Sequence, residues 1–161
     1  MNSIALLGIS ALALAACGTS NPHATAHPTP APPPPSIRLA ECAGMTAADV
    51  GAAAGLGAVT AVASNPLTCR WEHDPPDAVT FKWLRGSPID AYRTDPGQSP
   101  RAPLDVRGHR GYRWQQAHSC EVAAELGAGE FLTWTIESDP DATTDPCAGA
   151  TALAAATLDK S

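Results

Sequence analysis

The chain has 161 residues, a length that suits one domain and excludes a deep cleft between several domains. It carries 16 acidic and 10 basic residues and a formal net charge of -6, so it lacks the clustered positive charge on which general nucleic-acid binding depends. We therefore expect no nucleic-acid partner.

The N-terminus carries the pattern of an export signal. Residues 4–16 form an unbroken run of apolar and small residues that is too short to span a bilayer. The run ends in Leu14-Ala15-Ala16-Cys17, the lipobox pattern in which small residues precede a thiol that accepts a diacylglyceryl group. We therefore predict a signal peptide at residues 1–16 and a lipidated Cys17 that anchors the protein on the extracytoplasmic face of the cell membrane. The alternative is an ordinary cleaved signal peptide that leaves Cys17 without lipid.

Proline dominates the next segment, residues 17–36, which contains few large apolar side chains. Proline fixes φ and removes backbone hydrogen-bond donors, so the segment cannot fold compactly. We predict a disordered tether that follows the lipidated Cys17 and reaches at most about 60 Å from the membrane. A single globular domain is expected over residues 37–161.

Four further cysteines lie in this domain, and an even number of cysteines in an exported domain indicates two disulfides. Three pairings are possible. The pairing of sequence neighbours, Cys42 with Cys69 and Cys120 with Cys147, ties each predicted terminal helix to a strand and contributes roughly 3.5 kcal/mol per bridge on the chain-entropy model. A four-thiolate zinc site is less favoured, because zinc ligands usually come in closely spaced pairs and none exists here.

The first part of the domain predicts a helix and a hairpin. Thr46 and Asp49 form a capping-box pattern before an alanine-rich stretch, which predicts a helix over Ala47–Ala54. Apolar and polar residues alternate over residues 67–73 and 79–84, with a proline-containing turn between them, so these segments predict paired strands.

The middle of the domain contains several proline and glycine residues, which favour turns and loops. Ser87-Pro88 indicates a short helical turn with proline at its first position, and residues 95–103 indicate an exposed loop. Residues 104–114 predict two short strands that are hinged at glycines.

The last part gives the clearest hairpin, over residues 119–126 and 130–138 with a glycine-containing turn between them. Asp145 and Pro146 then predict the N-cap and first residue of a helix that ends near residue 158. The expected fold class is α+β: an antiparallel sheet of about five strands, with an N-terminal and a C-terminal helix on one face and two disulfides.

The domain contains several short sequence signatures. They are Cys42 before the first helix, Cys69-Arg70-Trp71, Gly108 with Gly111, Ser119-Cys120-Glu121-Val122, and Asp145-Pro146-Cys147. With the lipobox and the proline-rich tether, they resemble a family of small actinobacterial, mycobacterial-type lipoproteins of unknown function. The resemblance covers residues 42–153. It implies an outer-leaflet lipoprotein without an assigned activity.

No residues predict a catalytic or metal site. Ser119 lies beside His118, but neighbouring strand residues point to opposite faces, so we expect no nucleophile and base there. The other histidines of the domain, His73 and His109, show no metal-ligand spacing, and we expect surface or capping roles.

Two carboxylate pairs lie among prolines: Asp74 with Asp77, and Asp139 with Asp141. Solvated turns are the favoured interpretation, and a weak calcium site is the alternative. We expect no cofactor and no metal.

Two other groups of side chains are candidates for ligand contact. One is a basic stripe, for which the solvated face of a strand is favoured over an anion-binding patch: Arg101, Arg107, Arg110 and Arg113. The other is a set of aromatic residues, for which core packing is favoured over a binding surface: Trp71, Trp83, Tyr112, Trp114 and Trp134.

These observations favour a non-catalytic binding or interaction module of the cell envelope. Its expected partners are the membrane, through the lipid anchor, and an unknown envelope protein or lipid. A cell-envelope enzyme with an unrecognised site is the alternative.

Overall fold

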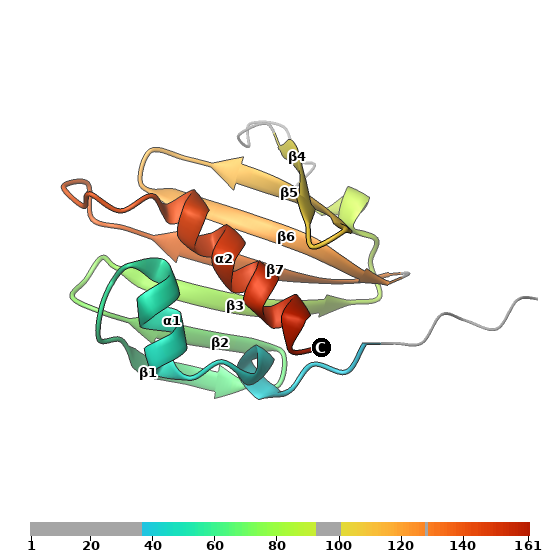
Figure 1. The fold of residues 1–161 in the computed structure, drawn as a ribbon, viewed down its shortest axis with the longest axis horizontal. Coiled ribbons are helices and arrows are strands. Elements are labelled where there is room, and N and C mark those ends of the chain that lie inside the picture. The colour runs from blue at the N-terminus through green and yellow to red at the C-terminus, as the bar shows by residue number, and fades with distance from the viewer. Residues whose placement is uncertain (1–36, 93–100, 128) are drawn as a thin grey trace, which may run out of the picture. The chain divides into compact units, whose positions relative to one another are not determined.

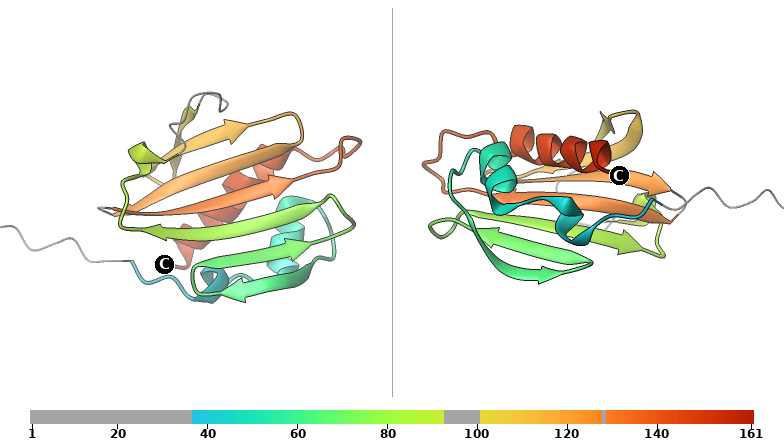
Figure 2. Two further views of the ribbon diagram at one scale, coloured as in Figure 1. Left: turned by 180° about the vertical axis from the view of Figure 1, so that it is seen from behind. Right: turned by 60° about the horizontal axis from the view of Figure 1, so that its bottom comes forward.

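A seven-stranded antiparallel sheet forms the centre of the domain, and two α-helices lie over the same face of it (Figure 1 and Figure 2). The computed structural model describes residues 37–92, 101–127 and 129–161. The predicted signal peptide, Cys17 and the tether lie outside these residues.

The described strands are β1 (Thr60–Asn65), β2 (Thr68–Glu72), β3 (Ala78–Arg85), β4 (Ala102–Val106), β5 (His109–Gln115), β6 (Ser119–Gly127) and β7 (Glu130–Glu137). The helices are η1 (Glu41–Gly44), α1 (Ala47–Ala54), η2 (Ile89–Ala91) and α2 (Pro146–Asp159), where η denotes a short 3-10 helix. The strand order in the sheet is β1-β2-β3-β7-β6-β5-β4, with each neighbouring pair antiparallel.

Both predicted α-helices are confirmed, and their caps explain where they begin. At α1, Thr46 Oγ1 accepts from the Asp49 N–H at 3.2 Å and Asp49 Oδ2 accepts from the Thr46 N–H at 3.1 Å, which completes the capping box. At α2, Asp145 Oδ1 accepts from the Cys147 N–H at 2.9 Å and Pro146 is the first helical residue. None of the helices among the described residues is long and apolar enough to cross a membrane.

The core lies between the helices and the sheet, with Trp134 of the central strand β7 at its middle. The Trp134 ring stacks on Trp71 with 5.7 Å between ring centroids and packs against Phe81 at 5.1 Å. Its indole N–H donates to Thr157 Oγ1 of α2 at 3.0 Å, so a buried polar group is satisfied and the helix is fixed over the sheet.

The antiparallel α+β class is confirmed, but the sheet has seven strands and not about five. β1 was not predicted. The loop expected over residues 95–103 is wrong at its end, because β4 begins at Ala102 and includes Pro103. Residues 93–100 lie outside the described part. The short helix η2 begins at Ile89, so Pro88 is its N-cap and not its first residue.

The two expected disulfides are present, and they join sequence neighbours. The Cys42–Cys69 bond connects η1 to β2, and the Cys120–Cys147 bond connects β6 to α2. Each bridge therefore ties a segment on the helical side to the sheet.

The face of the sheet without α-helices carries a second, smaller cluster that is partly covered by η2 (Figure 2). Its buried members are Ile89, Trp114, Ala123 and Phe131. Near the β2–β3 turn, this face carries polar side chains, among which Arg70 donates hydrogen bonds to Thr80 and Glu137.

Candidate functional site

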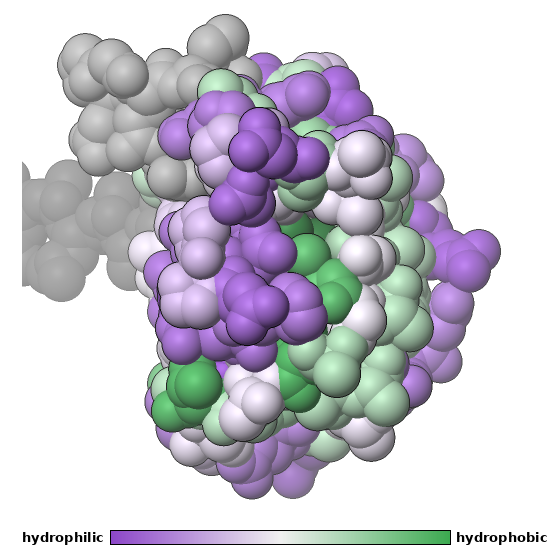
Figure 3. All heavy atoms as spheres, turned by 90° about the vertical axis from the view of Figure 1, so that its left-hand side faces the viewer, coloured by the Kyte–Doolittle hydropathy of each residue, from purple (hydrophilic) through white to green (hydrophobic). Residues whose placement is uncertain are grey.

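Three loops meet at one end of the sheet, which is drawn at the left of Figure 1 and faces the reader in Figure 3. They are residues 73–77 between β2 and β3, 116–118 between β5 and β6, and 138–145 between β7 and α2. We call this region the loop end. Figure 3 shows that hydrophilic and hydrophobic residues both reach its surface.

The sheet register brings these loops together. Ala78 at the start of β3 pairs with Glu137 at the end of β7, and Glu137 also pairs with Ser119 at the start of β6. The turn before β3, the loop before β6 and the segment after β7 must therefore leave the sheet side by side.

Hydrogen bonds fix the loops to one another. The Ser138 N–H donates to the His118 carbonyl oxygen at 2.8 Å, and the Asp139 N–H donates to Asp77 Oδ1 at 2.6 Å. The Cys120–Cys147 disulfide closes the same end of the sheet from the side of α2. The loop end is thus held by covalent and hydrogen-bonded links between segments that are distant in sequence.

A pocket of about 570 Å³ opens between these loops, and we call it the loop-end pocket. Its polar lining residues are Arg70, Gln116, His118, Ser119, Glu137 and Ser138. Its apolar lining residues are Pro76, Ala117 and Pro140. A hollow with apolar walls and several convergent polar groups is the usual form of a small-molecule site.

Arg70 brings a guanidinium to the pocket. Its Nε donates to Glu72 Oε1 at 2.9 Å, and its Nη1 donates to Thr80 Oγ1 and to Glu137 Oε2, both at 3.2 Å. The hydrogen bond to Glu72 is the largest cause of a raised Arg70 pKa, and Glu137 adds to it. The carboxylates of Glu72 and Glu137 therefore compensate the charge of the Arg70 guanidinium. Arg70 Nη2 makes no hydrogen bond to a described residue, so it can donate to a ligand.

Ser119 and Ser138 bring hydroxyl groups to the pocket. Ser119 and His118 line the same pocket, contrary to the expectation of opposite faces, because His118 precedes β6 and strand alternation does not apply to it. None of the described hydrogen bonds joins Ser119 Oγ to the His118 ring. Ser138 is only 6% exposed, and its buried Oγ has no hydrogen-bond partner among the described residues.

The two carboxylate pairs lie in turns, as expected, but the structure joins them into one region. Asp77 accepts the hydrogen bond from Asp139 described above, and Asp139 Oδ1 also accepts from the Asp141 N–H at 2.8 Å. Within the described residues, no group of three His, Cys, Asp or Glu side chains could hold a metal ion.

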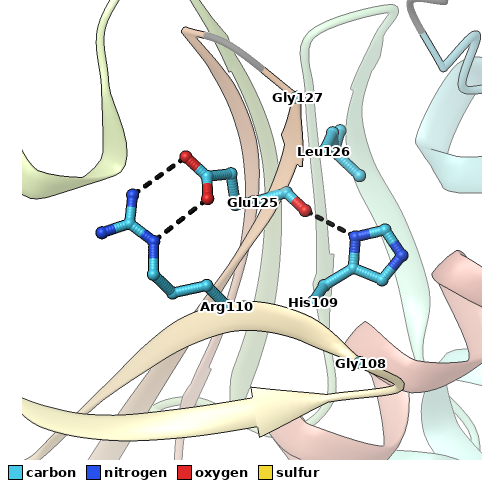
Figure 4. Close-up of a pocket in the computed structure, with 6 residues that line it drawn as sticks. All are labelled: Gly108, His109, Arg110, Glu125, Leu126 and Gly127. Carbon is cyan, nitrogen blue, oxygen red and sulfur yellow. Dashed lines mark hydrogen bonds and ion pairs between the residues drawn. The ribbon is translucent and has the colours of Figure 1, made fainter. Parts of the chain in front are cut away.

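A second hollow of about 470 Å³ lies at the far end of β5 and β6 (Figure 4). His109 Nδ1 lies 2.8 Å from the Glu125 carbonyl oxygen, and the Arg110 guanidinium donates to the Glu125 carboxylate at 3.1 and 3.0 Å. Figure 4 shows the His109 and Arg110 side chains pointing away from each other, so these two side chains do not converge on a common ligand position.

The basic stripe is largely neutralised by carboxylates. Arg110 donates to Asp90 Oδ2 at 2.7 Å, and Arg107 donates to Asp159 Oδ2 at 2.9 Å. The Arg101 guanidinium lies over the Tyr112 ring at 4.2 Å. Arg113 alternates with Tyr112 along β5 and so lies on the other face of the sheet. The four residues do not form one anion-binding patch.

Most of the aromatic candidates belong to the core. Trp71, Trp114 and Trp134 are at most 2% exposed, which confirms core packing for these three. Trp83 and Tyr112 are partly exposed and lie against the guanidinium groups of Arg85 and Arg101. The four cysteines of the domain are consumed by disulfides and are not nucleophiles.

A family model described as "Protein of unknown function (DUF3558)" matches residues 12–160 of the chain. The comparisons with curated proteins and with solved structures each gave no match.

Proposed function

The chain belongs to the DUF3558 family, described as of unknown function, and from that premise we propose that it is a membrane-anchored, extracytoplasmic lipoprotein that binds a ligand without catalysing a reaction. The ligand site that we assign to it is the loop-end pocket.

The anchoring part of the proposal is supported by residues of the N-terminus. The lipobox Leu14-Ala15-Ala16-Cys17 supplies the small residues and the thiol that lipidation requires. The two disulfides of the domain fit the same compartment, since disulfides persist outside the cytoplasm and are rare within it.

The binding part rests on one observation: a pocket of about 570 Å³ that is lined by three loops fixed to one another and by residues at or near the ends of the adjoining strands β2, β6 and β7. Fixed loops lower the entropy cost of ligand binding, because little must be ordered when the ligand arrives. Binding is favoured over an envelope enzyme because catalysis by Ser119 would require a base in hydrogen-bond contact with its hydroxyl, and no described hydrogen bond supplies one.

Native mass spectrometry of the chain purified from its envelope fraction tests the binding site. We expect a co-purifying small molecule on the wild-type protein and its loss from the Ala117→Trp variant, in which an indole fills the pocket from an exposed loop position. Ala48→Trp, at an exposed position of α1, is the matched control and should retain the molecule. Equal retention by both variants would show that the pocket is not the binding site.

A further inference from the structure

The loop-end pocket is surrounded by negative charge. The lining residues and their direct neighbours in sequence include four carboxylates and a single Lys or Arg side chain, Arg70. The carboxylates are Asp77, Glu137, Asp139 and Asp141. Arg70 forms ion pairs with both Glu72 and Glu137, so one positive charge faces two negative charges and the three side chains together carry a net charge of -1.

One of these carboxylates can reach a ligand directly. The Glu137 side chain is 49% exposed and lines the pocket, and its Oε2 is the atom that accepts from Arg70. Its Oε1 accepts no described hydrogen bond, so it can take a hydrogen bond from a ligand ammonium group.

The rest of the pocket suits an apolar body. Pro76, Ala117 and Pro140 present carbon surface between the polar groups. A bare metal ion does not match this lining, and the part of the chain that the structure describes holds no cluster of metal-binding side chains. An anionic ligand would be repelled by the carboxylates of Asp77, Asp139 and Asp141, which adjoin the lining residues in sequence.

We propose that the loop-end pocket binds an organic cation, namely an ammonium group carried on an apolar body, with Glu137 as the direct partner of the ammonium. This inference rests on the proposed function, because it names the ligand class of the same pocket.

Three probes with one ring and different charges test it: benzylamine, benzyl alcohol and benzoate. The full-length ¹⁵N-labelled chain is titrated with each at pH 8, above the ordinary titration range of histidine, and the amide signals of Ala117, Ser119 and Ser138 are followed. We expect benzylamine to bind at least about fivefold more tightly than benzyl alcohol, and benzoate to bind more weakly than either. Raising the salt concentration from about 20 mM to about 200 mM should weaken benzylamine binding severalfold.

A pair of double variants separates a local charge effect from a general one. Asp139→Asn with Asp141→Asn removes two carboxylates at the rim, while an asparagine at position 139 keeps the side-chain oxygen that accepts from the residue 141 N–H. We expect about threefold or greater loss of benzylamine affinity. The matched control, Asp105→Asn with Asp159→Asn, removes the same charge at exposed positions that do not line the pocket and should bind as the wild type does.

The outcomes also distinguish this inference from the proposed function. Equal binding of all three probes, or equal loss in both double variants, would overturn the preference for cations while leaving a binding pocket in place. If none of the probes shifts the amide signals of Ala117, Ser119 and Ser138, the cation inference is also overturned. The co-purification experiment would then test independently whether the loop-end pocket binds any ligand.

Discussion

Asp90 joins η2 to the sheet through its carboxylate. The Tyr112 hydroxyl donates to Asp90 Oδ1 at 2.7 Å, and Arg110 donates to Asp90 Oδ2 at the same distance. The hydrogen bond from Tyr112 is the largest cause of a lowered Asp90 pKa, and the bond from Arg110 is the next. The ionised carboxylate therefore fixes the segment that covers the second hydrophobic cluster.

The Asp90→Asn variant tests this role through pH. The pKa is lower in the folded state than its ordinary value of about 3.9, so the carboxylate stabilises the fold above that value and this contribution is lost as pH falls through the folded pKa. We expect the variant to unfold at lower urea concentration than the wild type at pH 7, and the difference to shrink at about pH 2. An equal difference at both pH values would contradict the role assigned to the charge.

At the scale of the elements, Gly149 of α2 lies in close contact with α1 and β7. A Cβ added there would lie 2.7 Å from Ile136 Cδ1 and 3.0 Å from the Ala53 carbonyl oxygen. Glycine is therefore required by the contact of α2 with α1 and β7, and not by the backbone conformation of the helix.

Gly149→Ala should destabilise the domain although alanine favours helices. Overpacking of a tight contact costs roughly 1–3 kcal/mol, which exceeds the propensity gain of about 1 kcal/mol. Gly127→Ala is the matched control, since an added Cβ there would meet nothing within 4 Å. Urea denaturation should show a clear loss of unfolding free energy for the first variant and little change for the second. A Gly149→Ala protein as stable as the wild type would contradict the assigned packing.

The elements that the sequence predicted were those with a strong local signal. The caps of α1 and α2 and the alternation in β2 and β3 follow from neighbouring residues. β1 gave no such signal, because all six of its residues are exposed and no apolar alternation marks it. β4 was missed at its start because Pro103 indicated a loop, yet β4 is an edge strand, where proline is tolerated.

At the scale of the whole molecule, the loop-end pocket could not be predicted from local pattern. Arg70, Gln116, Glu137 and Ser138 come from distant segments, and only the order of strands in the sheet brings them together. The sequence left three disulfide pairings open, and the favoured pairing of sequence neighbours is the one in the structure, with Cys42 in η1 and not in the predicted helix α1. Each bridge closes a loop of sequence separation 27 and contributes roughly 3.5 kcal/mol on the chain-entropy model.

The intact mass of the protein, measured separately in membrane and cytosolic fractions of producing cells, tests the anchored, extracytoplasmic assignment most directly. We expect the membrane form to begin at Cys17 with acyl groups attached and its other four cysteines oxidised in pairs, and the Cys17→Ala variant to lose the acyl mass and leave the membrane. A full-length polypeptide in the cytosol with free thiols would contradict the assignment.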